Sequence, residues 1–347
     1  MRKIAIFVLL LFMSLQACVR SPAKQILFDD PSLSRVWPSP PEQPRIKLIK
    51  VFKGAEEFLN PKGRIQSFFE ALTGEHGHSF DLMAPAGIAA DGERFIYVAD
   101  PSARLVHRFD LRENEIVYLT HAGTEPLASP VGVALDMDGN CYVTDSVKAK
   151  VYKYNADAEY VGTIGQGVID FKRPAGIAIA RNGNKYVADV LSNKVFVFDR
   201  YDRFVSDFPN PLYSEGLNKP VNIAVDKSNN VYVTDAFSFA VKVFDEKGNL
   251  IKTIGRIGDG PGTFSRPKGV AVDSESHVYI VDANFDNFQI FNEEGRLLLY
   301  VGSAGKKPGE FFMPNGIFID REDRIYLSDS YNQRVQIFQY IKEQAAK

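Results

Sequence analysis

The sequence has few of the residues on which cross-links, metal sites and nucleic-acid binding depend. Its 347 residues include two cysteines, five histidines and one tryptophan. Two cysteines cannot form a disulfide framework. The 41 basic and 43 acidic residues leave a formal net charge of −2, so the basic excess that favours nucleic-acid binding is missing. We therefore expect no nucleic-acid partner, no cofactor and no metal.

The apolar segment near the N-terminus is too short to cross a bilayer. Residues 4–13 carry no charge and follow Met1-Arg2-Lys3, whereas a membrane-spanning helix needs about 20 apolar residues. This pattern is typical of a secretory signal peptide. The segment ends in Leu15-Gln16-Ala17-Cys18, which resembles the lipobox of bacterial lipoproteins.

The lipobox resemblance implies a lipoprotein signal peptide over residues 1–17 and a lipid anchor on Cys18. Val19, in place of an aspartate, implies sorting to the outer membrane, on its periplasmic or its surface side. The alternative is an ordinary signal peptide with a chance cysteine. Both predict export, so we expect a role outside the cytoplasm.

Residues 18–44 are predicted to form a tether between the lipidated cysteine and the folded domain. Six prolines between residues 19 and 44 disfavour a helix or a central strand. The only tryptophan, Trp37, lies here. It either fixes the tether to the domain or belongs to a linear segment that binds a partner.

A repeat of about 46 residues organises the rest of the chain. Six segments begin with Pro-x-Gly or Pro-x-Asn and have a Tyr-x-x-Asp sequence that starts twelve residues after the proline. The prolines are Pro85, Pro130, Pro174, Pro220, Pro267 and Pro314. Runs of β-branched and aromatic residues between Asn, Asp and Gly turns predict three or four short strands in each repeat. Residues 45–347 are therefore predicted to be one all-β domain, a six-bladed β-propeller.

The number of strands predicts how the ring closes. The sixth repeat has no room for a fourth strand, because few residues follow its third strand at 335–340. Residues 46–53, which contain Leu-Ile-Lys-Val-Phe, resemble the fourth strand of another repeat at 250–254. We expect residues 46–53 to complete the last blade and leave no free sheet edge.

The repeated sequences Pro-x-Gly-Val/Ile-Ala and Val-Tyr-Val-Thr/Ala-Asp, followed by Val-x-Val-Phe-Asp, resemble the NHL repeat over residues 85–340. Known NHL proteins include amidating lyases, receptor sensor domains, protein- and RNA-binding modules and exported bacterial propellers. The resemblance therefore implies the fold and leaves the function open. Function in such propellers usually lies on the face around the mouth of the central channel.

Aromatic residues follow the strand-end aspartate in blades four to six and are predicted to form a binding patch on that face. Asn222 replaces the repeat glycine in blade four and Phe318 replaces the small residue in blade six, so we expect an asymmetric channel lining. The candidate partner- or ligand-binding residues are Phe237, Phe239, Phe285, Tyr331, Asn222 and Asn315. The alternative is that the aromatic rings fold back and pack between blades.

An insertion at residues 54–84 precedes the first repeat. Its apolar residues follow a helical period that includes Phe68 and Phe69, which predicts a short amphipathic helix. This helix is expected to lie over the channel face as a lid. It either docks on the propeller's own surface or acts as a gate or a partner-binding helix.

Together these features predict a non-catalytic envelope lipoprotein whose propeller face binds a protein partner or a small ligand. One alternative is a metal-dependent lyase or lactonase acting in the channel; the other is a scaffold within a larger envelope complex. His76-Gly77-His78 has a metal-binding spacing but no evident third ligand. No Walker loop or haem Cys-x-x-Cys-His sequence is present.

Overall fold

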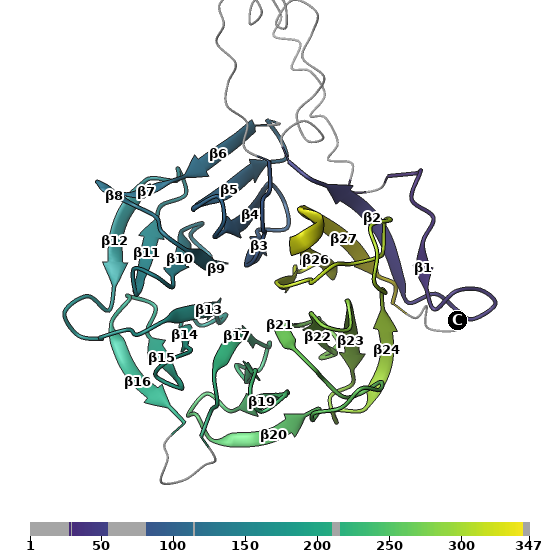
Figure 1. Ribbon diagram of the computed structural model, residues 1–347. Helices are drawn as coiled ribbons and strands as arrows, with labels where there is room; N and C mark the ends of the chain where they lie inside the picture. The colour runs from purple at the N-terminus through teal and green to yellow at the C-terminus, as the bar shows by residue number, and fades with distance from the viewer. Residues whose placement is uncertain (1–27, 29, 55–80, 114, 210–215, 343–347) are drawn as a thin grey trace, which may run out of the picture.

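The computed structural model describes residue 28 and residues 30–54, 81–113, 115–209 and 216–342. In this part of the chain, six antiparallel sheets stand radially around one central axis (Figure 1). The prediction of an all-β six-bladed propeller is confirmed. Cys18 and the inserted segment with Phe68 and Phe69 lie outside the described residues.

Each blade is a sheet whose first strand lies nearest the central axis and whose fourth strand lies on the outside of the ring. The inner strands are β3 (Ile88–Ala90), β9 (Pro130–Leu135), β13 (Pro174–Ile179), β17 (Pro220–Val225), β21 (Pro267–Val272) and β25 (Ile317–Ile319). The second strands are β4 (Phe95–Asp100), β10 (Cys141–Asp145), β14 (Lys185–Asp189), β18 (Val231–Asp235), β22 (Val278–Asp282) and β26 (Arg324–Asp329).

The third strands are β5 (Leu105–Asp110), β11 (Lys150–Tyr154), β15 (Lys194–Phe198), β19 (Ala240–Phe244), β23 (Asn287–Phe291) and β27 (Arg334–Tyr340). The outer strands are β6 (Glu115–Leu119), β12 (Tyr160–Ile164), β16 (Phe204–Phe208), β20 (Leu250–Ile254), β24 (Leu297–Val301) and β2 (Ile46–Phe52). The remaining elements are β1 (Val36–Trp37), the hairpin β7 (His121–Ala122) and β8 (Glu125–Pro126), and a short 3₁₀ helix (Ser330–Asn332).

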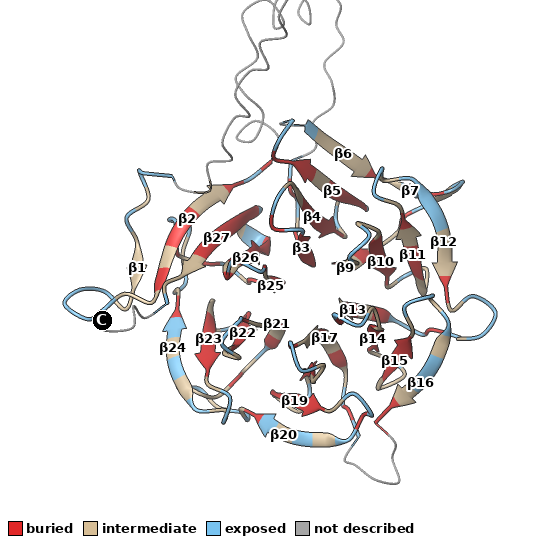
Figure 2. Ribbon diagram, turned by 180° about the vertical axis from the view of Figure 1, so that it is seen from behind, coloured by how far each residue is buried: buried red, intermediate tan, exposed pale blue. Residues whose placement is uncertain are grey.

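The hydrophobic core lies between neighbouring blades. The second strands, such as β18 and β22, are buried along their whole length, whereas outer strands such as β20 and β24 alternate between half-buried and exposed residues (Figure 2). This difference explains why the second strands are runs of apolar residues. A strand that is covered on both faces needs no alternation of apolar and polar side chains. In four blades the buried repeat tyrosine donates its hydroxyl to the aspartate of the turn between the first two strands, as Tyr279 does to Asp273 at 3.0 Å.

The inner strands approach one another closely, and this explains the glycine of the Pro-x-Gly sequence. A Cβ atom at Gly176 would lie 2.6 Å from the Cα atom of Asn222 in the next blade. Backbone hydrogen bonds also join the inner strands of neighbouring blades, as from the N–H of Gly269 to the carbonyl of Asn315 at 2.9 Å. A side chain at the glycine position would push these strands apart.

The ring closes as the sequence predicts. Strand β2 pairs antiparallel with β27, from Ile46 opposite Tyr340 to Phe52 opposite Val335. Sheet order in the last blade is β1-β2-β27-β26-β25. The N-terminal strand therefore completes the blade that contains the C-terminal strand.

The tether contributes a fifth strand that the sequence analysis did not predict. Strand β1 pairs with the outer edge of β2, and the Trp37 ring packs edge-on against Phe338 at a centroid distance of 5.7 Å. The guanidinium of Arg35 lies over the indole at 5.5 Å. Trp37 thus fixes the end of the tether to the closing blade. No helix in the described ranges is long and apolar enough to cross a membrane.

Candidate functional site

One face of the ring collects the features that sequence analysis associated with binding. The inner strands begin and the second strands end on this face, because Pro220 pairs with Asp235 and Pro267 with Asp282. We call it the top face. It carries the loops that enter each blade and the turns that follow each strand-end aspartate.

The strand-end aspartates hold these loops and turns in place. The carboxylate of Asp282 accepts hydrogen bonds from the backbone N–H groups of Ser265 and Arg266 in the entering loop. It also accepts hydrogen bonds from the N–H groups of Asn284 and Phe285 in the turn. Asp100, Asp145 and Asp189 make the same set of contacts. These aspartates are structural, and they give the top face a rigid backbone.

Exposed apolar side chains occupy the second position after the aspartate in four blades. They are Val147, Leu191, Phe237 and Tyr331, which are 71%, 53%, 65% and 65% exposed. We call these four residues the apolar rim. The sequence analysis named Phe237 and Tyr331 but missed the two aliphatic residues, although an alignment of the repeats at the aspartate would have revealed them.

The other two predicted aromatic residues, Phe239 and Phe285, are half-buried. Phe239 is in the left-handed region with φ 52° and its N–H donates to the carbonyl of Ala236. Tyr331 contacts a further exposed ring, Phe312, at a centroid distance of 5.3 Å. The exposed aromatic surface is therefore centred on Phe237 and on the Tyr331–Phe312 pair.

The two predicted asparagines lie at the start of inner strands and have different surroundings. The Oδ1 atom of Asn222 accepts hydrogen bonds from the N–H of Ile223 at 2.9 Å and of Val270 at 3.3 Å. Asn222 thereby joins the inner strands of blades four and five and also lines the channel. Asn315 is half-buried, and its backbone bonds to Ser328 and Gly269.

The central channel contains a cavity of about 140 Å³. All six inner strands line it, mainly with valine, isoleucine, alanine and leucine side chains and with backbone at the glycine positions. Phe318 fills the place that alanine has in the other five blades and packs near Tyr326, at a centroid distance of 6.1 Å. No ionisable side chain is among the lining residues in the described part of the chain.

Three cationic residues flank the repeat proline on the top face of blades three and five, and two of them, Arg173 and Arg266, are exposed. Arg173 and Arg266 directly precede the repeat proline in blades three and five, and Lys268 directly follows it in blade five. Burial lowers the pKa of the Lys268 ammonium group, and the nearby charges of Arg266 and Arg173 lower it further. We call these three residues the cationic trio. Lys219 precedes the proline of the intervening blade.

The described histidines do not converge on the channel. His107 is fully buried in β5, where it stacks on Phe109 and its Nε2 atom lies 3.8 Å from Asp100, beyond hydrogen-bond distance. His121 is exposed in β7, and His277 lies on the opposite face. Within the described ranges, no three His, Cys, Asp or Glu side chains are placed to hold a metal ion. His76 and His78 lie outside those ranges.

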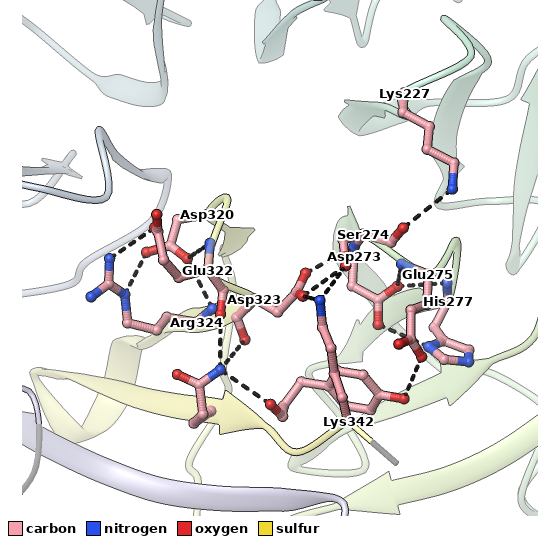
Figure 3. Close-up of polar contacts among 12 residues, drawn as sticks. Lys227, Asp273, Ser274, Glu275, His277, Asp320, Glu322, Asp323, Arg324 and Lys342 are labelled. Carbon is pink, nitrogen blue, oxygen red and sulfur yellow. Dashed lines mark hydrogen bonds and ion pairs between the residues drawn. The ribbon is translucent and has the colours of Figure 1, made fainter. Parts of the chain in front are cut away.

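The opposite face carries a network of charges that are already paired (Figure 3). Asp323 accepts hydrogen bonds from the N–H and the hydroxyl of Ser274 in the neighbouring blade, and the Lys342 ammonium lies 2.8 Å from its carboxylate. Asp273 holds the His277 ring at 2.9 Å. These contacts join blades five and six and hold Lys342, the last residue that the structure describes, so we interpret this network as structural.

Comparisons with known proteins agree with the fold. A family model described as a 6-bladed beta-propeller matches residues 214–288 and 274–343. A search of curated proteins finds no match to this chain.

Three similar solved structures share the propeller architecture. One is a structural genomics protein of unknown function from Bacteroides thetaiotaomicron, with 16% identity and a TM-score of 0.60 over 74% of this chain and 70% of that one. Another is an auxiliary nutrient binding protein from the same species, with 15% identity and a TM-score of 0.59 over 75% of this chain and 70% of that one. The third is a virginiamycin B lyase from Staphylococcus aureus, with 14% identity and a TM-score of 0.57 over 85% of this chain and 100% of that one. At these identities the likeness concerns the fold alone.

Proposed function

We propose that this protein is a non-catalytic binding protein of the bacterial cell envelope, anchored by a lipid on Cys18. In this proposal the repeats are of NHL type, the anchor is in the outer membrane, and the top face of the propeller holds a protein partner or a small ligand. The observation that carries the proposal is the apolar rim, since large apolar side chains recur at one exposed position in four blades. Large apolar side chains that are exposed together on one face commonly mark a binding site.

The described channel residues support binding over catalysis. A lyase or lactonase needs an acid, a base or a metal at the reacting bond, whereas the side chains that line the cavity are apolar apart from Asn222. One of the similar structures is a lyase, so a lyase or lactonase is the second candidate function. Metal analysis of the purified full-length chain tests it, because a tightly bound divalent metal would favour the enzyme.

The binding proposal is tested by cross-linked capture from intact envelopes with the tagged full-length chain. The variant Phe237→Asp/Tyr331→Asp places two charges in the apolar rim. A matched control, Val205→Asp/Leu298→Asp, places two charges on the outer strands, where these side chains are 57% and 52% exposed. A partner retained by the control and lost by the rim variant supports the proposal, whereas equal capture by both variants contradicts it.

A further inference from the structure

We infer that the top face binds a protein partner whose contact surface is acidic and carries large apolar side chains. This inference rests on the proposed binding role of the top face and names the chemistry of the partner. It follows from how exposed apolar and charged side chains are divided between the two faces of the ring, a division that the formal net charge of −2 does not reveal.

The first argument is that exposed apolar side chains surround the whole top face. Besides the apolar rim, four large apolar residues are exposed in the loops that enter blades one, three, five and six. They are Met83, Val168, Ile257 and Phe312. Together with the apolar rim they give every blade at least one exposed apolar side chain on this face. In the described turns of the opposite face, the only exposed large apolar residues are Met137 and Tyr201.

The second argument is the charge of the top face. Six exposed cations in its loops and turns make no ion pair and donate no side-chain hydrogen bond in the described part of the chain. They are Arg104, Arg173, Arg256, Arg266, Lys306 and Lys307. The exposed acidic residues of the described top-face loops are fewer, namely Asp81, Asp170 and Asp259, and Asp170 is paired with Lys172. Cations that stand beside apolar side chains favour an acidic partner over a basic one.

The opposite face has the reverse balance of charge. In its described turns acidic residues outnumber basic ones, and five blades expose an acidic side chain there. These residues are Glu93, Asp138, Glu246, Glu293 and Glu322. An acidic partner is therefore attracted to the top face and repelled by the opposite face.

The third argument is that the backbone holds the apolar rim in fixed positions. The N–H groups of Val147 and Leu191 each donate to the carboxylate of the strand-end aspartate, at 3.1 Å. The N–H groups of Phe237 and Tyr331 donate to carbonyls of the loop that enters the same blade. Side chains on a preorganised backbone bind a partner with a smaller loss of conformational entropy than side chains on a mobile loop do.

The position of the tether favours a protein over a membrane as the occupant of the top face. An anionic membrane would also match apolar and cationic side chains. The ring of Phe28, the first described residue, lies against the guanidinium of Arg324 at 4.2 Å, where β26 begins on the opposite face. The predicted anchor, Cys18, precedes Phe28 by ten residues. The described chain therefore joins the ring at the edge of the face that lacks the apolar side chains.

The test selects binders from a displayed library of random twelve-residue peptides, with the full-length chain as bait. We expect the selected peptides to combine acidic residues with aromatic or leucine residues, and to lose binding to the rim variant Phe237→Asp/Tyr331→Asp. The charge variant Arg256→Gln/Arg266→Gln removes two exposed cations from the loop that contains Ile257. It is expected to weaken a selected peptide about tenfold, because two exposed ion pairs with the peptide are lost.

Matched controls separate the top face from general effects of charge. Arg112→Gln/Arg181→Gln removes two exposed arginines from turns of the opposite face and is expected to bind a selected peptide as the wild type does. The outer-strand control of the capture experiment is expected to do the same. Added salt is expected to weaken binding to the wild type more than binding to the charge variant, since exposed charges are screened. The membrane alternative is tested by sedimenting the Cys18→Ser chain, which has no site for the lipid, with phosphatidylglycerol vesicles.

Four results would overturn the inference: selection of no peptide that depends on the apolar rim, selected peptides without an excess of acidic residues, equal binding to the charge variant, or vesicle binding that the rim variant abolishes. Each is distinguishable from failure of the proposed function. If the rim variant loses its envelope partner while the charge variant keeps it, only the inference of an acidic partner fails. If the rim variant keeps every envelope partner, the protein-partner form of the proposed function fails and the inference fails with it.

Discussion

Truncating Trp37 to alanine is expected to loosen the seam at which the propeller ring closes. The indole packs against Phe338 of β27, lies beneath the guanidinium of Arg35, and covers Gly309 in the loop that enters the last blade. It therefore bridges the tether, the closing strand pair and a neighbouring loop. These segments are distant in sequence, so the contact contributes to closure rather than to local structure.

The expected loss of stability follows from how much of the Trp37 indole is buried. Truncation of a fully buried large aromatic residue costs about 3–5 kcal/mol. Trp37 is half-buried, so we expect a loss of about 2 kcal/mol in the free energy of unfolding, part of it from the cation–π contact with Arg35. The matched control is Tyr201→Ala, which removes a ring that is 67% exposed and lies beside Arg200 and Arg203. It is expected to change stability by less than about 0.5 kcal/mol.

The assay is urea unfolding followed by circular dichroism and, in the wild type, by tryptophan fluorescence. Trp37 is the only tryptophan in the chain, so its emission reports on the docked tether without interference. Both signals are expected to change in one transition. The reasoning is refuted if Trp37 has the emission of a fully hydrated indole in the folded protein, or if its truncation and the Tyr201 control have equal effects.

Three further perturbations test the fold and its charges. Gly176→Ala is expected to lower the free energy of unfolding by about 1–3 kcal/mol because its Cβ atom would overlap the next blade. The control in thermal melts is Gly162→Ala, whose added Cβ atom would have no neighbour within 4 Å, and it should be neutral or slightly stabilising. Lys242→Met is expected to cost about 3–5 kcal/mol in chemical denaturation, since it leaves the carboxylate of Asp235 buried without its cation; an unchanged midpoint would contradict this role. The hydrogen bond to a carboxylate raises the pKa of His277, so its stabilising contribution is complete below the ordinary histidine pKa of about 6.5 and is lost as pH rises through the higher folded value. His277→Asn should therefore cost more stability at about pH 5.5 than at about pH 8.5, and an equal loss at both would show that the ion pair contributes nothing.

The sequence alone determines the architecture because the repeat is local and recurs six times. The proline, the tyrosine and the strand-end aspartate keep the same spacing in every blade. The proline begins the inner strand, the tyrosine fills the core between blades, and the aspartate holds the entering loop. Ring closure is also predictable, because a missing strand at one end and an extra strand at the other leave a single complementary pairing. The exposure of Phe237 and Tyr331 agrees with their place in the repeat.

Only the tertiary structure decides which departures from the repeat come together. Arg173 and Lys268 are in blades three and five, and only the closed ring brings their charges near enough for Arg173 to lower the pKa of Lys268. The sequence suggests that the Asn222 side chain is available to a ligand, yet its Oδ1 atom accepts a hydrogen bond from the backbone of the next blade. Trp37 lies in a proline-rich segment whose docking depends on the surface of the closing blade. Local periodicity encodes the blades, whereas the electrostatics and packing of the site depend on contacts between blades that no spacing in the sequence specifies.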